Sequence, residues 1–217
     1  MADIFHEVDE EVRRERLAQF WQRYSILIIA ACVLVIAGVG GWRGYVWYMA
    51  REAAVAGAQF EAAATLAEQG KADEAQAAFA KVAAEAPGGY ATLARFRAAA
   101  ELAPSKRDEA VKAYDSLAAD ASLSPLWQDL AAIRAALLLV DTAPLTEMQR
   151  RLEPLAESGR AYRHSARDLL ALAAWRAKDP ALAKKYLDMI AADGETPPGI
   201  RSRADVLAAL IAGNGKS

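Results

Sequence analysis

Charged residues are missing from one stretch near the start of the chain. Nineteen residues, Tyr24 to Trp42, separate Arg23 from Arg43, and nearly all of them are apolar. At about 1.5 Å per residue, a helix of this length covers the hydrocarbon core of a bilayer. Rings that favour the headgroup level stand at both edges, namely Tyr24 at one and Trp42, Tyr45, Trp47 and Tyr48 at the other. The pattern predicts a transmembrane helix over residues 24–48.

Other interpretations of this stretch fit less well. A secretory signal has an apolar run of only about 7–15 residues, whereas this run is longer and follows more than twenty residues of charged chain. Ile29-Ala30-Ala31-Cys32 is similar to a lipoprotein cleavage box, but cleavage before Cys32 would divide a continuous apolar run. A buried core helix is the remaining alternative, although such runs are usually shorter. We therefore expect a membrane anchor.

The tail before this run, residues 1–23, is charged but carries apolar residues at roughly helical spacing. These residues are Ile4, Phe5, Val8, Val12, Leu17, Phe20 and Trp21. The spacing predicts an amphipathic entry helix that lies on the inner leaflet and continues into the span.

Basic residues flanking a span set its orientation, because loops rich in Lys and Arg stay in the cytoplasm. Four of them precede the span and two follow it closely: Arg13, Arg14, Arg16 and Arg23 against Arg43 and Arg51. The excess favours a cytoplasmic N-terminus. In a bacterium, this places the anchor in the inner membrane and the C-terminal part in the periplasm.

The region after the span reads as a series of short helices. It is rich in Ala, Leu, Glu, Arg and Lys, which are good helix formers. No stretch alternates polar and apolar residues as a strand would. Glycine and proline divide the region into roughly nine helices of 12–20 residues. These breaks fall at 70–71, 87–89, 104–105, 124–125, 142–144, 158–159, 179–180 and 194–199. The predicted fold is all-α.

The helices repeat with a period of 35 residues. The segment 70–82, Gly-Lys-Ala-Asp-Glu-Ala-Gln-Ala-Ala-Phe-Ala-Lys-Val, aligns with 105–117, Ser-Lys-Arg-Asp-Glu-Ala-Val-Lys-Ala-Tyr-Asp-Ser-Leu. The same spacing gives two series of equivalent positions. The first series is Val82, Leu117, Leu152 and Leu187, and the second series is Ala67, Leu102, Leu137 and Leu172. A lone helix pair cannot bury its apolar face, so pairs at this period stack into a solenoid.

The first pair resembles a tetratricopeptide repeat. Ala75, Phe79, Val82 and Pro87 fall on the small-aromatic-small-proline spacing of that family, and Ala110 and Tyr114 continue it in the second pair. The Trp-Leu-Gly-Tyr signature of the first helices is largely absent. The resemblance implies an α-solenoid of four pairs, over 52–86, 89–121, 125–157 and 161–193, with a capping helix at 199–212. The repeat domain is expected over 49–213, with a flexible C-terminus at 214–217.

The residues that would carry chemistry are few. His6 and His164 are too few for a histidine-based metal site, and no phosphate-binding loop or nucleophile motif is present. His164 and Asp168, four apart on one predicted helix, are interpreted as part of a solvated, salt-bridged face. The acidic pairs 73–74 and 108–109 stand at predicted helix starts, where the helix dipole favours them. We expect no catalysis, cofactor, metal or small-molecule substrate, and a formal charge of −2 gives no pointer to nucleic acid.

Two sets of residues are candidates for binding partner proteins. Within the span, small residues four apart would let another helix approach closely; these are Ala37, Gly40, Gly41 and Gly44. On the inner face of the solenoid, arginine and aromatic side chains would suit unfolded or acidic polypeptide segments. These are Tyr90, Arg95, Arg97, Trp127, Arg134, Arg163 and Arg167. For each of them, solvated charge or a place in the core is an equally good interpretation.

The whole chain resembles the YfgM-like ancillary subunits of the bacterial SecYEG translocon, of the alphaproteobacterial type. The resemblance rests on the opening 3–16, on Trp21-Gln-Arg-Tyr24 and on Gly41-Trp-Arg-Gly-Tyr-Val-Trp47, and elsewhere it is mostly architectural. It implies a partner in the SecYEG translocon, another in a membrane-anchored periplasmic chaperone, and work on secreted or envelope proteins.

Two other classes of function share this architecture. One is an envelope assembly scaffold with a defined folded partner, acting in cell division, cytochrome maturation or peptidoglycan synthesis. The other is a regulator that faces the cytoplasm, which would require the opposite topology.

Overall fold

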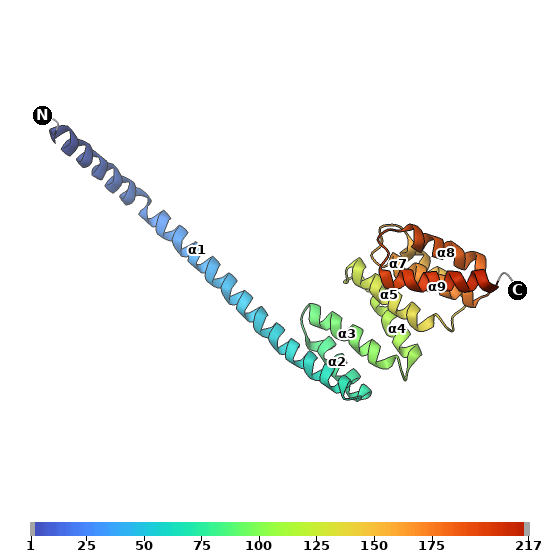
Figure 1. The fold of residues 1–217 in the computed structure, drawn as a ribbon. Coiled ribbons are helices and arrows are strands. Elements are labelled where there is room, and N and C mark those ends of the chain that lie inside the picture. The colour runs from blue at the N-terminus through green and yellow to red at the C-terminus, as the bar shows by residue number, and fades with distance from the viewer. Residues whose placement is uncertain (1–2, 215–217) are drawn as a thin grey trace. The chain divides into compact units, whose positions relative to one another are not determined.

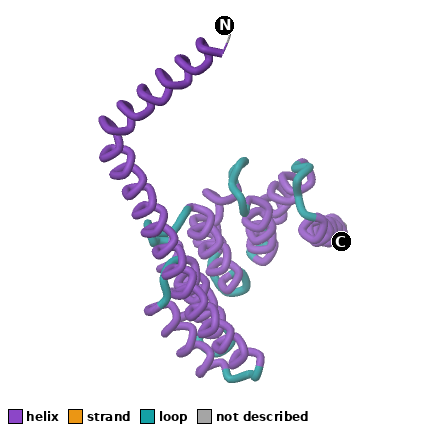
Figure 2. The backbone as a smooth tube through the Cα atoms, turned by 90° about the vertical axis from the view of Figure 1, so that its left-hand side faces the viewer, coloured by secondary structure: helices purple, strands orange, loops and turns teal. Residues whose placement is uncertain are grey.

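The computed structural model describes residues 3–214, and over this range the chain forms nine α-helices and no strand (Figures 1 and 2). The prediction of an all-α fold is therefore confirmed. The helices are α1 (Asp3–Glu68), α2 (Ala72–Glu85), α3 (Gly89–Leu102), α4 (Arg107–Ala118), α5 (Pro125–Leu139), α6 (Leu145–Ala156), α7 (Arg163–Arg176), α8 (Pro180–Ala192) and α9 (Pro198–Asn214). The end of the predicted flexible C-terminus, residues 215–217, lies outside the described range.

The chain divides into two units, Met1–Ala54 and Val55–Ser217. The first consists of most of α1, and among the described residues α1 is the one helix long and apolar enough to cross a membrane, with a mean hydropathy of 2.4 in its most apolar window. None of that window is buried. Of the predicted amphipathic tail, the side chains of Phe20 and Trp21 are exposed, whereas those of Ile4, Phe5, Val8, Val12 and Leu17 lie outside the described set.

The second unit is an array of antiparallel helix pairs followed by one more helix. The end of α1 packs on α2 through Phe60 and Phe79, and the next pairs along the chain are α3 with α4, α5 with α6, and α7 with α8. The breaks fall where glycine and proline predict them. Pro125 and Pro180 open α5 and α8, because the first turn of a helix needs no donor there. Gly70 and Gly88 adopt the positive φ angles of 76° and 61° in the turns on either side of α2.

The first 35-residue series lies in the core. Val82, Leu117, Leu152 and Leu187 are all buried, because each sits on the second helix of a pair and faces the next layer. The second series behaves differently. Leu137 and Leu172 are exposed, whereas Ala67 and Leu102 are half-buried. The shared period thus marks a core position on the second helices and a surface position on the first helices.

The apolar interior is divided into three clusters along the array. The first surrounds Phe79 between the end of α1, α2 and α3. The second surrounds Tyr114 and Leu117 between α3, α4 and α5. The third and largest surrounds Leu152 and Leu170 and takes in α5 to α9. This layered arrangement is the one expected of stacked repeats, in which each pair is covered by its neighbours.

Candidate partner-binding groove

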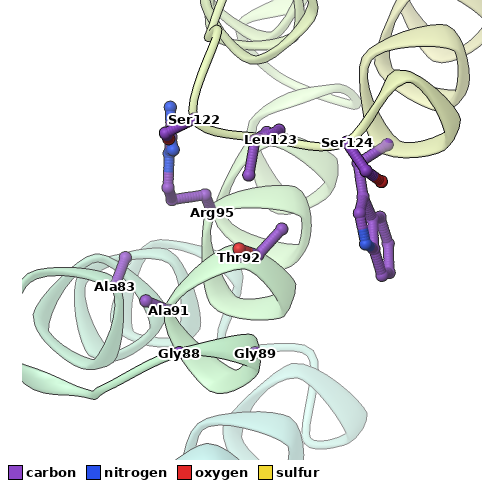
Figure 3. A pocket seen from close by; sticks show the side chains of 10 residues that line it. Ala83, Gly88, Gly89, Ala91, Thr92, Arg95, Ser122, Leu123 and Ser124 are labelled. Carbon is purple, nitrogen blue, oxygen red and sulfur yellow. The ribbon is translucent and has the colours of Figure 1, made fainter.

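A groove of about 570 Å³ runs alongside α3 (Figure 3). Its residues come from the end of α2, the start of α3, the loop before α5 and the first turn of α5. They are Ala83, Gly88, Gly89, Ala91, Thr92, Arg95, Ser122, Leu123, Ser124 and Trp127. A second hollow of about 310 Å³ lies between α2, α3 and α4, and it shares Ala83 and Arg95 with the first. Arg95 therefore stands where the two hollows meet.

One wall of the groove is the loop between α4 and α5, which internal hydrogen bonds hold in place. Arg95 Nη1 donates to Asp120 Oδ2 at 2.6 Å, and Ser122 donates to Asp120 Oδ1 from its backbone nitrogen at 3.0 Å and from Oγ at 2.6 Å. Gln128 Nε2 donates to the carbonyl oxygens of Asp120 and Leu123. The Ser122 hydrogen bonds and then the Arg95 guanidinium lower the pKa of Asp120 to about 2. The wall is thus formed before any ligand arrives.

The groove also contains an aromatic side chain, that of Trp127 in the first turn of α5. Trp127 is half-buried and packs against Phe96, with ring centroids 5.5 Å apart. Packing on one side holds the indole in place and leaves part of it free to contact a ligand. Trp127 was open to two interpretations, a partner-binding residue or a core residue. Its half-buried ring is compatible with both.

The lining of the groove suits an extended polypeptide. Glycine and alanine at one side let a backbone approach closely, and Thr92, Ser122 and Ser124 offer hydroxyl groups to it. Arg95 is the cation of the lining and Trp127 its aromatic surface. In Figure 3 the Arg95 side chain reaches from α3 toward Ser122. No carboxylate is among the lining residues, but the charge of Arg95 is already balanced by Asp120 at 2.6 Å, so the lining is close to neutral overall.

Of the predicted binding residues on the solenoid, Arg95 and Trp127 meet in this groove, and two others do not. Arg97 is exposed, lies over the Phe79 ring at 5.4 Å and pairs with Glu101. Arg134 is exposed on α5. Neither residue lines the groove, and their role in binding stays a prediction.

Tyr90 packs inside the first helix layer. Its ring centroid is 6.1 Å from that of Phe60, and its hydroxyl lies so close to Gly57 that a Cβ added there would be 2.9 Å away. The absence of a side chain at Gly57 therefore makes room for the Tyr90 hydroxyl. Tyr90 is half-buried, and its contact with a partner stays a prediction.

We expect Gly57→Ala to destabilise the array, because the added methyl group would press on the Tyr90 hydroxyl. The loss should be about 1–2 kcal/mol, in the range of an overpacked core. Tyr90→Phe removes the hydroxyl but leaves the ring carbon that carried it 3.2 Å from the added Cβ, so the double variant should recover part of the stability. Urea unfolding of the four proteins in mild detergent, followed by circular dichroism, measures this. Equal losses with and without the Tyr90 hydroxyl would contradict the close approach.

Arg163 and Arg167 are held in internal ion pairs and are not solvated as one interpretation expected, and their contact with a partner stays a prediction. Arg163 Nε donates to Asp193 Oδ2 at 2.8 Å, and Arg163 also pairs with Glu195. Arg167, only 3% exposed, donates to the carbonyl of Ala156 at 2.9 Å and to Asp193 at 3.0 Å. Both arginines therefore tie the loop after α8 to α7. These pairs could not be predicted from local spacing, because they join residues 26 and 30 positions apart.

His164 and Asp168, predicted to be close enough to pair, have partners elsewhere. His164 Nδ1 is 3.1 Å from the Thr196 hydroxyl, which donates to the Ile190 carbonyl. Asp168 accepts from Arg203 of α9 at 2.6 Å. Both residues are buried, so the face is salt-bridged but it is not solvated.

We expect stability to fall as the pH drops below about 6.5, the ordinary pKa of histidine. Burial lowers the pKa of His164, and Arg163 and Arg167 act in the same direction, whereas Asp193 and Glu195 oppose them. The unfolded chain therefore takes up the proton first, which favours unfolding as the pH falls. The urea midpoint at pH ~5.5 should lie below that at pH ~7.5, and His164→Asn should flatten this difference. The lowered pKa of Asp193 acts only at more acidic pH. An unchanged slope in the variant would contradict this assignment.

The small residues of the span lie on an exposed face of α1. Ala37, Gly40, Gly41 and Gly44 are all exposed, and a Cβ added at any of the three glycines would meet no atom within 4 Å. The space needed for a neighbouring helix is present. Contact with such a helix stays a prediction.

Sequence reasoning missed the hydroxyl and glycine residues of the groove. The breaks at 87–89 and 124–125 mark Gly88, Gly89 and Ser124 only as turn residues, and no pattern points to Ser122. The proximity of two helix starts, α3 and α5, was the available signal, because both first helices begin at the same end of their pairs. Among the described residues, no group of three or more potential metal ligands is present.

Comparison with known proteins gives one family. The family model described as "Tetratricopeptide repeat-like domain" matches residues 18–169, which is more than half of the chain. Neither the curated proteins nor the solved structures include a significant match. The family match covers the groove completely.

Proposed function

Since the chain belongs to the family of tetratricopeptide repeat-like domains, we propose that it is a membrane-anchored interaction module whose groove receives extended segments of other polypeptides. The observation that carries this proposal is the groove alongside α3, with Arg95 and Trp127 among its lining residues. The apolar helix at the start of the chain anchors the module. The protein performs no catalysis of its own in this proposal.

The charges and the shape of the groove support polypeptide as the ligand. The Arg95 guanidinium and the hydroxyls of Thr92 and Ser124 can bind side-chain carboxylates and backbone groups. Trp127 offers an aromatic face to apolar residues. An unfolded segment can adopt the extended form that these contacts require, at the cost of its own ordering.

The site of action that fits best is the SecYEG translocon, as in the YfgM-like ancillary subunits. In this proposal the N-terminus is cytoplasmic, α1 crosses the inner membrane, and the helix pairs lie in the periplasm beside a membrane-anchored chaperone. The excess of arginine before the span supports this orientation. Secreted and envelope proteins that emerge from the translocon would be the clients.

Photo-crosslinking from the groove tests the proposal. A photoreactive amino acid replaces Thr92 in the full chain in cells, and captured proteins are identified by mass spectrometry. We expect secreted chains and translocon subunits. The matched control carries the same amino acid at Lys112, an exposed position on α4, and should capture far less. Division or cell-wall proteins at Thr92 would favour the envelope scaffold, and no capture above the control would contradict the groove.

Topology has a separate test. A reporter that is active in only one compartment, fused after Ser217, should show the periplasmic signal. A cytoplasmic signal would contradict the orientation and would favour the regulator instead.

A further inference from the structure

The groove alongside α3 contains a guanidinium that leaves most of its donors unused. A guanidinium carries five N–H groups in a planar fork. Arg95 Nη1 donates to Asp120 Oδ2 at 2.6 Å. Neither Nε nor Nη2 of Arg95 has a hydrogen-bond partner within the part of the chain that the structure describes. These donors remain available to a ligand.

The carboxylate of Asp120 does not depend on Arg95 alone. Asp120 Oδ1 accepts from the backbone nitrogen of Ser122 at 3.0 Å and from its hydroxyl at 2.6 Å. The Ser122 hydroxyl contributes more than Arg95 to the lowered pKa of Asp120. The carboxylate therefore stays ionised and in place when Arg95 binds a second acceptor.

Asp120 contacts Arg95 from outside the two hollows. Arg95 lines both hollows, whereas Asp120 lines neither of them. The Arg95 side chain is 36% exposed, so it has a fixed contact on one side and an open side. A segment that lies in the groove can therefore reach the unused N–H groups without displacing Asp120.

One guanidinium already serves two carboxylates elsewhere in this chain. Arg151 Nε donates to Glu147 at 2.6 Å, while its Nη1 and Nη2 donate to Asp115 at 2.5 and 3.0 Å. The planar fork of arginine has enough donors for both acceptors. Arg95 can share its fork in the same way, with a carboxylate of a bound segment as the second acceptor.

An additional donor helps one of the carboxylates in both places. Arg150 also donates to Glu147, at 2.7 and 2.9 Å, which offsets the second negative charge near Arg151. Ser122 has the corresponding role for Asp120. The surroundings of Arg95 are thus suited to a second carboxylate.

We propose that Arg95 binds the carboxylate of an Asp or Glu side chain in the client segment while it keeps its hydrogen bond to Asp120. This inference rests on the proposed function of the groove and names the chemistry that the groove selects. Because Arg95 and Asp120 together are close to neutral, the selection occurs through charge-assisted hydrogen bonds at contact and not through long-range attraction.

The carboxylate comes from within the segment and not from its end. The two hollows share Ala83 and Arg95, so a bound chain continues past Arg95 in both directions. In the larger hollow it meets Trp127, whose ring favours an apolar residue. The preferred client is therefore an extended segment that carries an acidic residue and an apolar residue near each other.

A library of short random peptides, acetylated at the start and amidated at the end, tests this selection. The full chain in nonionic detergent is immobilised, and retained peptides are identified by mass spectrometry. We expect Asp and Glu to be enriched over Asn and Gln by about three- to tenfold, as for charge-assisted hydrogen bonds at a partly exposed site. Retained peptides without this enrichment would overturn the inference but not the groove. Retention no greater than on bare resin would contradict the groove as well.

Three variants assign the enrichment to Arg95. Arg95→Gln should abolish it while neutral peptides are still retained, and Arg95→Lys should recover only part of it, because a lysine lacks the planar fork. Arg150→Gln makes the same change of charge at an exposed position of α6 outside the groove and should leave the enrichment intact. Circular dichroism confirms that each variant is folded. Enrichment that persists in both Arg95 variants at the wild-type level, or that is lost in Arg150→Gln, would overturn the inference.

The source of the carboxylate has its own comparison. The same library with free carboxyl ends should show the same enrichment of Asp and Glu and no greater retention. A gain of tenfold or more that is confined to the free carboxyl ends would overturn the assignment to side chains, because the groove would then bind the end of a chain.

Discussion

Replacing Phe79 with alanine should destabilise the repeat domain by about 3–5 kcal/mol, the range for a fully buried phenylalanine. Phe79 is 0% exposed and is the one large side chain that is fully buried in its cluster. Its ring meets Phe60 edge to face at 5.1 Å and lies under the Arg97 guanidinium. The other buried members are small, mostly alanines, so they cannot move in to fill the cavity.

Urea unfolding of the full chain in mild detergent, followed by far-ultraviolet circular dichroism, measures the loss. Phe79→Leu keeps most of the volume and should cost less than about 1.5 kcal/mol. Lys81→Ala, on the exposed side of the same helix, should leave the midpoint unchanged. A loss for Phe79→Ala no greater than that for Phe79→Leu would show that the first cluster is loosely packed.

Replacing Arg167 with alanine should cost about 2–3 kcal/mol, because it leaves buried acceptors without a donor. The Arg167 side chain reaches three separate segments: Ala156 at the end of α6, Met189 in α8 and Asp193 in the following loop. Asp193 keeps Arg163 as a partner, and this limits the loss. The carbonyl oxygen of Ala156 would lose the hydrogen bond that Arg167 donates to it.

The matched variant is Arg167→Lys, which retains the charge. A lysine ammonium is a single donor group without the planar fork of arginine, so it should recover only part of the stability. Arg150→Ala removes an exposed arginine from α6 and should leave the urea midpoint unchanged. If Arg167→Ala unfolds at the wild-type midpoint but loses clients in cells, that result would contradict the structural role and support the prediction that Arg167 binds a partner.

The helix pairs could be predicted from the sequence because their signals are local. Glycine and proline mark the turns, and the 35-residue period places Val82 and Leu117 in the core, where both are found. The acidic pairs at 73–74 and 108–109 lie in the first turns of α2 and α4, as expected. Each of these features depends on residues within one helix or one turn, so a linear pattern is sufficient to find it.

The roles of the arginines could not be predicted because they depend on residues far away in the chain. Arg95 reaches Asp120, and Arg163 reaches Asp193. Local spacing says that an arginine stands on a first helix, but it does not say which loop folds over it. The same limit applies to Tyr90, whose surroundings are decided by the absence of a side chain at Gly57.

The division of the interior into three clusters has a consequence for how the array opens. Units with few buried side chains unfold locally at a lower free energy than units with many. The cluster around Phe79 has five buried members, whereas the cluster around Leu170 has seventeen. Backbone amides of α2 should therefore exchange their hydrogens for deuterium much sooner than those of α7, and the array should loosen from its first pair while its last pairs remain closed.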